Sequence, residues 1–275
     1  LEPWHINIFE FLELKENGDD RERAHDIFPA LWIPDEFMRR VEADADWTLF
    51  SPHVVPKLHD TFDSKDNEAA FTRMYCEAEA AGLGSKTVKA EDLWQKILTR
   101  IYQHGTWWPC FKDVTNARYM QNGPGQNHVV HHSNLCTEIT LRDTEDTSFV
   151  CNLGSINVAH KNHLLQLRHD NTGNISFDWN TKLESTVRKW IRNLDAVITI
   201  GVTPHEKGRK FQLEDRAIGL GAMGETMAIQ MMGINYESKE HVQYCFELWR
   251  QISLTAIHES ALLARSRGVY PRFHE

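Results

Sequence analysis

Three residues in the run HHSNLCTEITL carry side chains that could act together on one substrate. Read as an extended segment, residues 133–138 direct Asn134, Cys136 and Glu138 to the same face, about 6.5–7 Å apart at each step. A thiol supports nucleophilic, redox or radical chemistry, a carboxylate accepts a proton, and an amide orients a polar substrate. The pattern predicts a reactive site, and the alternative is a half-buried strand with a core cysteine.

Two other motifs match ligand-binding patterns, but each lacks the flanking sequence that such a site needs. Residues 219–224, GLGAMG, match GxGxxG, but the charged run PHEKGRKFQLEDRAI precedes them instead of a buried strand. We therefore expect a closely packed glycine-rich turn or helix start. His128, His131 and His132 could bind zinc, but no HExxH motif or matching Cys or carboxylate cluster accompanies them. We interpret them as surface or satisfied histidines and assign no metal ligand; a zinc hydrolase is a distant alternative.

Composition indicates a globular protein of a reducing compartment. The 275 residues are 41% hydrophobic and 25% charged, and the formal net charge of -9 disfavours nucleic acid and anionic membranes as partners. Five scattered cysteines include no CxxC pair, which is typical of a cytoplasmic protein. No apolar run reaches the ~20 residues of a membrane span, and the start lacks a signal peptide. A first residue other than Met suggests a piece of a longer protein.

Apolar periodicity predicts helices that must position these residues. The expected helices cover residues 35–41 with Asp35 as N-cap, 71–82, 93–105, 181–198 with Thr181 opening a capping box, and 242–268. The face expected to be buried in the fourth is Leu183, Val187, Trp190, Ile191, Leu194 and Ile198. In the last helix it is Val242, Cys245, Phe246, Trp249, Ile252 and Ala256.

A polar turn at residues 142–147 separates the HHSNLCTEITL run from a second apolar run, SFVCNLGSINV. This arrangement suggests a strand, a loop and a returning strand, which could bring Cys151 near Cys136. The spacing permits this approach without requiring it.

Five segments together resemble, in order, signatures of the catalytic (alpha, or R1) subunit of class I ribonucleotide reductase. They are LEPWHINIFEFLELK, ALWIPDEFMRRVE, SNLCTEI, CNLGSIN and RAIGLGAMG, and they span nearly the whole chain. The resemblance implies part of a helix-rich α/β barrel of ten strands, with a finger loop that carries a radical cysteine. Residues 1–127 would be a helical half with strands, 128–160 the finger loop with flanking strands, and 161–275 a helical continuation. Together they would make one piece of the barrel and not an independent domain.

The same resemblance implies a role for each site residue. Cys136 would be the thiyl radical that removes the 3′-hydrogen of a ribonucleoside diphosphate. Glu138 would take the proton of the 3′-hydroxyl, and Asn134 would hydrogen-bond the ribose. Cys151 would be one of two thiols that reduce the substrate as its 2′-hydroxyl leaves as water, forming a redox-active disulfide. The product would be a DNA precursor.

The resemblance also implies partners, and it names parts with no match in this chain. A metal-containing beta subunit would supply the radical, a thioredoxin or glutaredoxin type protein would supply electrons, and the chain itself would bind no cofactor. The second reducing cysteine, the effector-binding region and the C-terminal cysteine pair have no counterpart here. We therefore expect a split catalytic subunit that needs other fragments for activity. The alternative is a non-catalytic assembly module derived from the same barrel.

Overall fold

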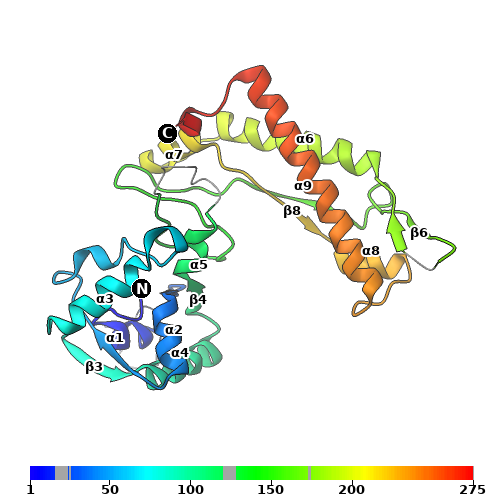
Figure 1. Ribbon diagram of the computed structural model, residues 1–275. Coiled ribbons are helices and arrows are strands. Elements are labelled where there is room, and N and C mark those ends of the chain that lie inside the picture. The colour runs from blue at the N-terminus through cyan, green and yellow to red at the C-terminus, as the bar shows by residue number, and fades with distance from the viewer. Residues whose placement is uncertain (16–23, 25, 120–127, 173–174, 275) are drawn as a thin grey trace. The chain divides into compact units, whose positions relative to one another are not determined.

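The computed structural model describes residues 1–15, 24, 26–119, 128–172 and 175–274 (Figure 1). They form two compact units, Leu1–Thr144 and Glu145–Glu275, each with its own hydrophobic core. The boundary falls inside the central segment 128–160, which the resemblance treats as one. The mixture of helices and strands confirms the α/β class.

The first unit combines two short strand pairs with helices. Strand β1 (Ala30–Ile33) runs parallel to β4 (Trp108–Phe111), and β2 (Asp46–Leu49) runs antiparallel to β3 (Lys86–Lys89). A parallel pair requires a long crossover, and helices supply it between β1 and β4. The helices and 3₁₀ turns of this unit are α1 (Ile8–Leu12), α2 (Asp35–Glu42), η1 (Pro56–Leu58), η2 (Lys65–Asn67), α3 (Ala70–Ala80), α4 (Ala90–His104) and α5 (Lys112–Ala117).

Aromatic side chains fill the centre of this unit. The Trp47 ring stacks on Tyr75 with centroids 4.3 Å apart, and Phe37 meets Trp47 edge-on at 5.0 Å. Helix α4 buries Leu93 and Ile97 against them and ends at Gly105, whose φ is +64°. The predicted helix over residues 93–105 is thereby confirmed.

Helix α2 begins where the sequence predicts, but its N-terminal contact comes from elsewhere. Pro34 occupies the N-cap position, not Asp35. The Asp35 N–H donates to the Asp113 carboxylate at 2.6 Å, and the Asp63 N–H donates to the other oxygen at 2.6 Å. Asp113, 78 residues along the chain, therefore replaces the expected local cap.

The second unit also contains one parallel and one antiparallel strand pair. Strand β5 (Leu153–Asn157) runs parallel to β8 (Gly219–Met223), and β6 (Leu167–His169) runs antiparallel to β7 (Ile175–Phe177). Helix α9 packs against α6, as their ribbons show (Figure 1). The helices are α6 (Thr181–Ile200), α7 (Glu206–Asp215), α8 (Glu225–Met231), α9 (Lys239–Arg267) and the 3₁₀ turn η3 (Pro271–His274).

Helix α6 confirms its predicted face but not its predicted cap. Five of the six expected residues are buried, and Trp190 packs against the same core while partly exposed. The N-cap is Asn180, one residue before Thr181, and its side chain accepts hydrogen bonds from the N–H groups of Lys182 and Leu183.

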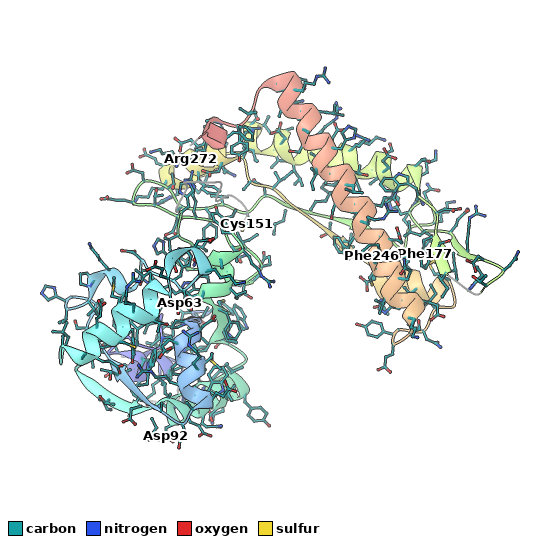
Figure 2. The ribbon with its side chains drawn as sticks, in the orientation of Figure 1. Asp63, Asp92, Cys151, Phe177, Phe246 and Arg272 are labelled. Carbon is teal, nitrogen blue, oxygen red and sulfur yellow. The ribbon has the colours of Figure 1, made fainter. Side chains whose placement is uncertain are left out.

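Helix α9 forms as expected, but its predicted buried face is confirmed only in part: Ile252 is buried, whereas other members of that face are exposed. Val242 is 70% exposed, and Phe246, labelled in Figure 2, is 60% exposed. The buried face includes Gln251 and Glu259, whose polar groups find partners on and beside α6. The spacing of apolar residues does not reveal these two positions, because a polar side chain with hydrogen-bond partners can also be buried.

Among the described residues, no helix combines the length and apolar character needed to cross a membrane.

Candidate active site

The segment with Asn134, Cys136 and Glu138 is a tight turn, not the extended strand that alternation predicts. The Thr137 N–H donates to the Asn134 carbonyl at 3.1 Å, and Thr137 has a φ of +62°. Cys136 is exposed, so the alternative of a core cysteine is also wrong. Within the described part of residues 128–152 there is no strand, and a loop with Cys136 in its turn replaces the expected one.

The amide of Asn134 organises this turn and connects two of the predicted site residues. Its Nδ2 donates to Glu138 Oε1 at 2.8 Å, and its Oδ1 accepts from the Ile139 N–H at 3.1 Å. Ser133 Oγ donates to the Ile139 carbonyl at 2.6 Å and closes the base of the turn. The side chains of Asn134 and Glu138 therefore meet beside Cys136, although not through the strand geometry that suggested them.

Two anchors hold the loop on the first unit. The buried amide of Asn116, on α5, both donates to the Val130 carbonyl (3.0 Å) and accepts from the Val130 N–H (2.7 Å). After the turn, the Arg142 N–H donates to the Tyr119 hydroxyl at 3.2 Å. Val130 is buried against Trp32 and Tyr119, so both ends of the loop are fixed to the same small cluster. Sequence reasoning missed Asn116, because a single amide on a short helix carries no periodic signal.

The three histidines of the sequence cluster each contact a charged side chain. His131 contacts Asp143 through Nδ1 at 3.1 Å and Asp60 through Nε2 at 3.2 Å, while His132 lies 3.5 Å from Asp143. His128 contacts the Arg142 guanidinium. The interpretation as satisfied histidines is thereby confirmed.

The contribution of His131, His132 and Asp143 to stability depends on pH. Burial alone would raise the pKa of Asp143, but hydrogen bonds with His131 and His132 outweigh burial and hold this pKa well below 3.8. Hydrogen bonding to Asp143 raises the pKa of both histidines above 6.5 against the effect of burial. The histidine contribution to stability is complete below pH 6.5 and is lost as pH rises through the raised pKa values. The Asp143 contribution is complete above pH 3.8 and is lost on acidification, so the cluster is strongest between pH 3.8 and 6.5.

Replacing Asp143 with asparagine should therefore lower the pKa values of both His131 and His132 toward 6.5, as followed by NMR titration of their ring protons. Asp60→Asn is the matched control, because Asp60 contacts only His131 of the pair and should lower that pKa alone. Unchanged histidine pKa values in Asp143→Asn would contradict this account.

Cys151 lies in the second unit, two residues before β5 begins (Figure 2). It is partly exposed, and the next residue fixes its backbone. Asn152 donates through Nδ2 to the Ala217 carbonyl at 3.2 Å, accepts from Gln212 at 3.1 Å, and its carbonyl accepts from the Gly219 N–H at 2.9 Å. The returning strand predicted for this run exists as β5, but it pairs with β8 and not with the Cys136 segment. The proximity of Cys151 to Cys136 stays a prediction.

The glycines of GLGAMG serve close packing, as expected. Gly219 begins strand β8, and a Cβ there would lie 2.7 Å from the Leu153 side chain. Gly224 adopts a φ of +83° as N-cap of α8, where a Cβ would lie 2.9 Å from Asn157 Oδ1. A dinucleotide turn needs its glycines after a strand, whereas Gly219 and Gly221 lie within β8 and of the three only Gly224 follows it.

A buried ion pair in the first unit gave no signal in the sequence. Lys112 is fully buried, and its Nζ donates to both Glu2 oxygens at 3.0 Å and to the carbonyls of Leu58 and His59. Trp4 Nε1 also donates to Glu2, at 2.7 Å. Burial lowers the pKa of Lys112, although the Glu2 charge opposes this shift. The pair joins the start of α5 to the first residues of the chain.

Comparison with known proteins agrees with the resemblance. A family model described as "Ribonucleotide reductase, barrel domain" matches residues 1–275. The ribonucleoside-diphosphate reductase subunit alpha of Chlamydia muridarum is 41% identical over 279 residues, covering 99% of this chain and 25% of that protein. The large chain of Cryptosporidium parvum is 35% identical and the large subunit of Danio rerio is 34% identical, each over 99% of this chain and 32% of the relative.

The chain thus spans between a quarter and a third of these curated relatives, and the match extends along its whole length. It belongs to the family of ribonucleotide reductase barrel domains.

Proposed function

We propose that this chain supplies the radical site of a catalytic subunit that reduces ribonucleoside diphosphates to deoxyribonucleoside diphosphates. The observation that carries the proposal is the exposed Cys136 thiol in a tight turn, beside a carboxylate that the Asn134 amide holds at 2.8 Å. The names of the relatives, ribonucleoside-diphosphate reductase subunits, supply the substrate class.

In this proposal the Cys136 thiyl radical takes the 3′-hydrogen atom of the ribose and becomes a thiol. The Glu138 carboxylate accepts the 3′-hydroxyl proton, and the 2′-hydroxyl is protonated and leaves as water. Two thiols provide two electrons and become a disulfide, and the Cys136 thiol finally returns its hydrogen atom to C3′. Cys151 is proposed as one reducing thiol, and the other lies outside these 275 residues.

The turn geometry suits these roles. Cys136 must reach the ribose, and its position in a turn leaves the thiol exposed in this chain. The Asn134 amide holds Glu138 through Nδ2, and we assign the same amide to hydrogen-bond the ribose when substrate arrives. A carboxylate fixed by an amide acts as a general base with little reorganisation when the substrate arrives.

The proposal implies several partners. A metal-containing beta subunit supplies the radical, a thioredoxin or glutaredoxin type protein reduces the disulfide, and other parts of the catalytic subunit complete the site and bind nucleotide effectors. The five cysteines and the thiol chemistry are consistent with a reducing, cytoplasmic setting.

Replacing Glu138 with glutamine tests the proton-accepting role. The glutamine carbonyl can still accept from Asn134, but it cannot accept a proton, so turnover should fall by about 10²–10⁴-fold. The measurement is the rate of deoxyribonucleotide formation by the intact enzyme with its radical-generating subunit and a dithiol reductant. Glu77→Gln, at an exposed position on α3, is the control and should retain full activity.

Activity of Glu138→Gln within twofold of the parent would contradict this assignment. If Cys136→Ala also left activity intact, an assembly module without catalytic function would be the better account of this chain.

A further inference from the structure

Three side chains of types that can bind metal ions converge in the second unit, and none of them has a role in the proposed reaction. Glu225 is the first residue of α8, while His241 and Cys245 lie four residues apart near the start of α9. Their ligand atoms all lie within 4.8 Å of one another. His241 Nε2 is 2.9 Å from Glu225 Oε1, and the Cys245 thiol donates to the same oxygen at 3.4 Å.

The helix geometry explains this convergence. Residues at i and i+4 occupy the same face of a helix one turn apart, so His241 and Cys245 present a nitrogen and a sulfur side by side. Gly224, with its positive φ, turns the chain from β8 into α8 and places Glu225 opposite them. The three groups are brought together by two helices and not by a flexible loop.

The orientation of the imidazole is fixed from its other side. His241 is 8% exposed, and its Nδ1 contacts the backbone carbonyl of Tyr236, which can only accept a hydrogen bond. Nδ1 must therefore carry a hydrogen, and in the neutral ring Nε2 presents a lone pair to the Glu225 carboxylate. At 2.9 Å the two atoms share a second imidazole proton, and a metal ion that replaced this proton would hold them about 3.3 Å apart. Metal-binding histidines commonly have this arrangement, with the second nitrogen donating to a carbonyl.

We propose that Glu225, His241 and Cys245 bind one divalent transition-metal ion of the zinc type. At Zn–N and Zn–S lengths of about 2.0–2.3 Å, tetrahedral ligand atoms lie about 3.3–3.7 Å apart, and the present separations need only small side-chain adjustments to reach this. On binding, the Cys245 thiol loses its proton to solvent and water takes the fourth position. A mixed sulfur, nitrogen and carboxylate set favours zinc over magnesium or calcium, which prefer oxygen alone. The ion would join α8 to α9, independently of the reaction proposed above.

The test is metal binding by the intact protein, with Zn²⁺ and Co²⁺ as the probes. After removal of loose metal, the parent protein should retain one more Zn²⁺ per chain than Cys245→Ser, measured by mass spectrometry. Cys245→Ser and His241→Ala should each weaken Zn²⁺ binding at this site at least about 100-fold, since losing even a residue that only hydrogen-bonds to a metal ligand costs about 10–100-fold. Co²⁺ should give a thiolate charge-transfer absorption that Cys245→Ser removes.

Cys76→Ser and His169→Ala are matched controls, because both residues are exposed and neither belongs to the cluster; both should bind Zn²⁺ as the parent does. Serine keeps the size of Cys245, so this variant remains interpretable even if His241→Ala unfolds. Zn²⁺ should also raise the unfolding temperature of the parent but not of Cys245→Ser. Equal Zn²⁺ content in the parent and Cys245→Ser would overturn the proposal and leave Glu225 and His241 as an ordinary ion pair.

Discussion

Replacing Cys136 with serine should reduce turnover of the intact enzyme by at least about 10⁴-fold, the scale of removing a reacting side chain. An O–H bond is stronger than an S–H bond, so serine neither accepts the radical nor exchanges a hydrogen atom with the ribose. Cys136 is exposed and serine is similar in size, so the turn built by Asn134 and Ile139 should be retained. The measurement is deoxyribonucleotide formation with the radical-generating subunit present.

Two controls separate a chemical defect from a structural one. The radical signal of the partner subunit should persist in Cys136→Ser, because radical generation does not depend on this thiol. Cys76→Ser changes another exposed thiol, on α3, and should leave the rate within twofold of the parent. Residual turnover in Cys136→Ser above a few per cent would contradict a radical role for this cysteine.

Replacing Lys112 with methionine should lower the free energy of unfolding by about 3–5 kcal/mol, the cost of leaving one member of a buried ion pair without its partner. The Glu2 carboxylate is 3% exposed and would lose two hydrogen bonds of 3.0 Å, while the carbonyls of Leu58 and His59 would also lose their donor. The midpoint of chemical denaturation of the intact protein measures this loss.

A double variant tests whether the Glu2 charge causes the loss of stability in Lys112→Met. In Lys112→Met the Glu2 carboxylate keeps its contacts with His59 and Trp4 but loses its lysine partner. Glu2→Gln removes that carboxylate charge, so the double variant should be more stable than the sum of the two single changes implies. Lys89→Met changes an exposed lysine paired with the exposed Asp46 and should leave the midpoint unchanged, because solvent screens that pair. Equal midpoints for Lys112→Met and the parent would show that Lys112 is not needed to neutralise Glu2.

Local patterns predicted local structure well. The helix α4 and its end at Gly105 depend on apolar spacing and on glycine's access to positive φ, and both are visible within one segment. The buried face of α6 is likewise predicted by apolar spacing within one segment. The face of α9 is predicted only in part, because Gln251 and Glu259 are also buried, through partners on and beside α6 that are far away in sequence.

In the candidate site too, the sequence predicts the residue types but not the contacts that arrange them. The residue types at positions 134, 136 and 138 indicated chemistry, but the turn depends on the Asn134 amide and on a positive φ at Thr137, which alternation cannot show. Asn116 and Lys112 act across long sequence separations and gave no signal. The parallel pairing of β5 with β8 likewise depends on tertiary contacts.

Helix α5 has only six residues, yet it carries three connections that lead in different directions. Lys112 bonds to Glu2, and Asp113 accepts a hydrogen bond at the start of α2. Asn116 bonds to Val130, at the beginning of the loop that carries Cys136. A short rigid helix transmits displacement from one of these connections to the others. A substitution at Glu2 should therefore displace Cys136. Such a variant would lower the turnover rate as well as the stability, although Glu2 is remote from the reacting groups.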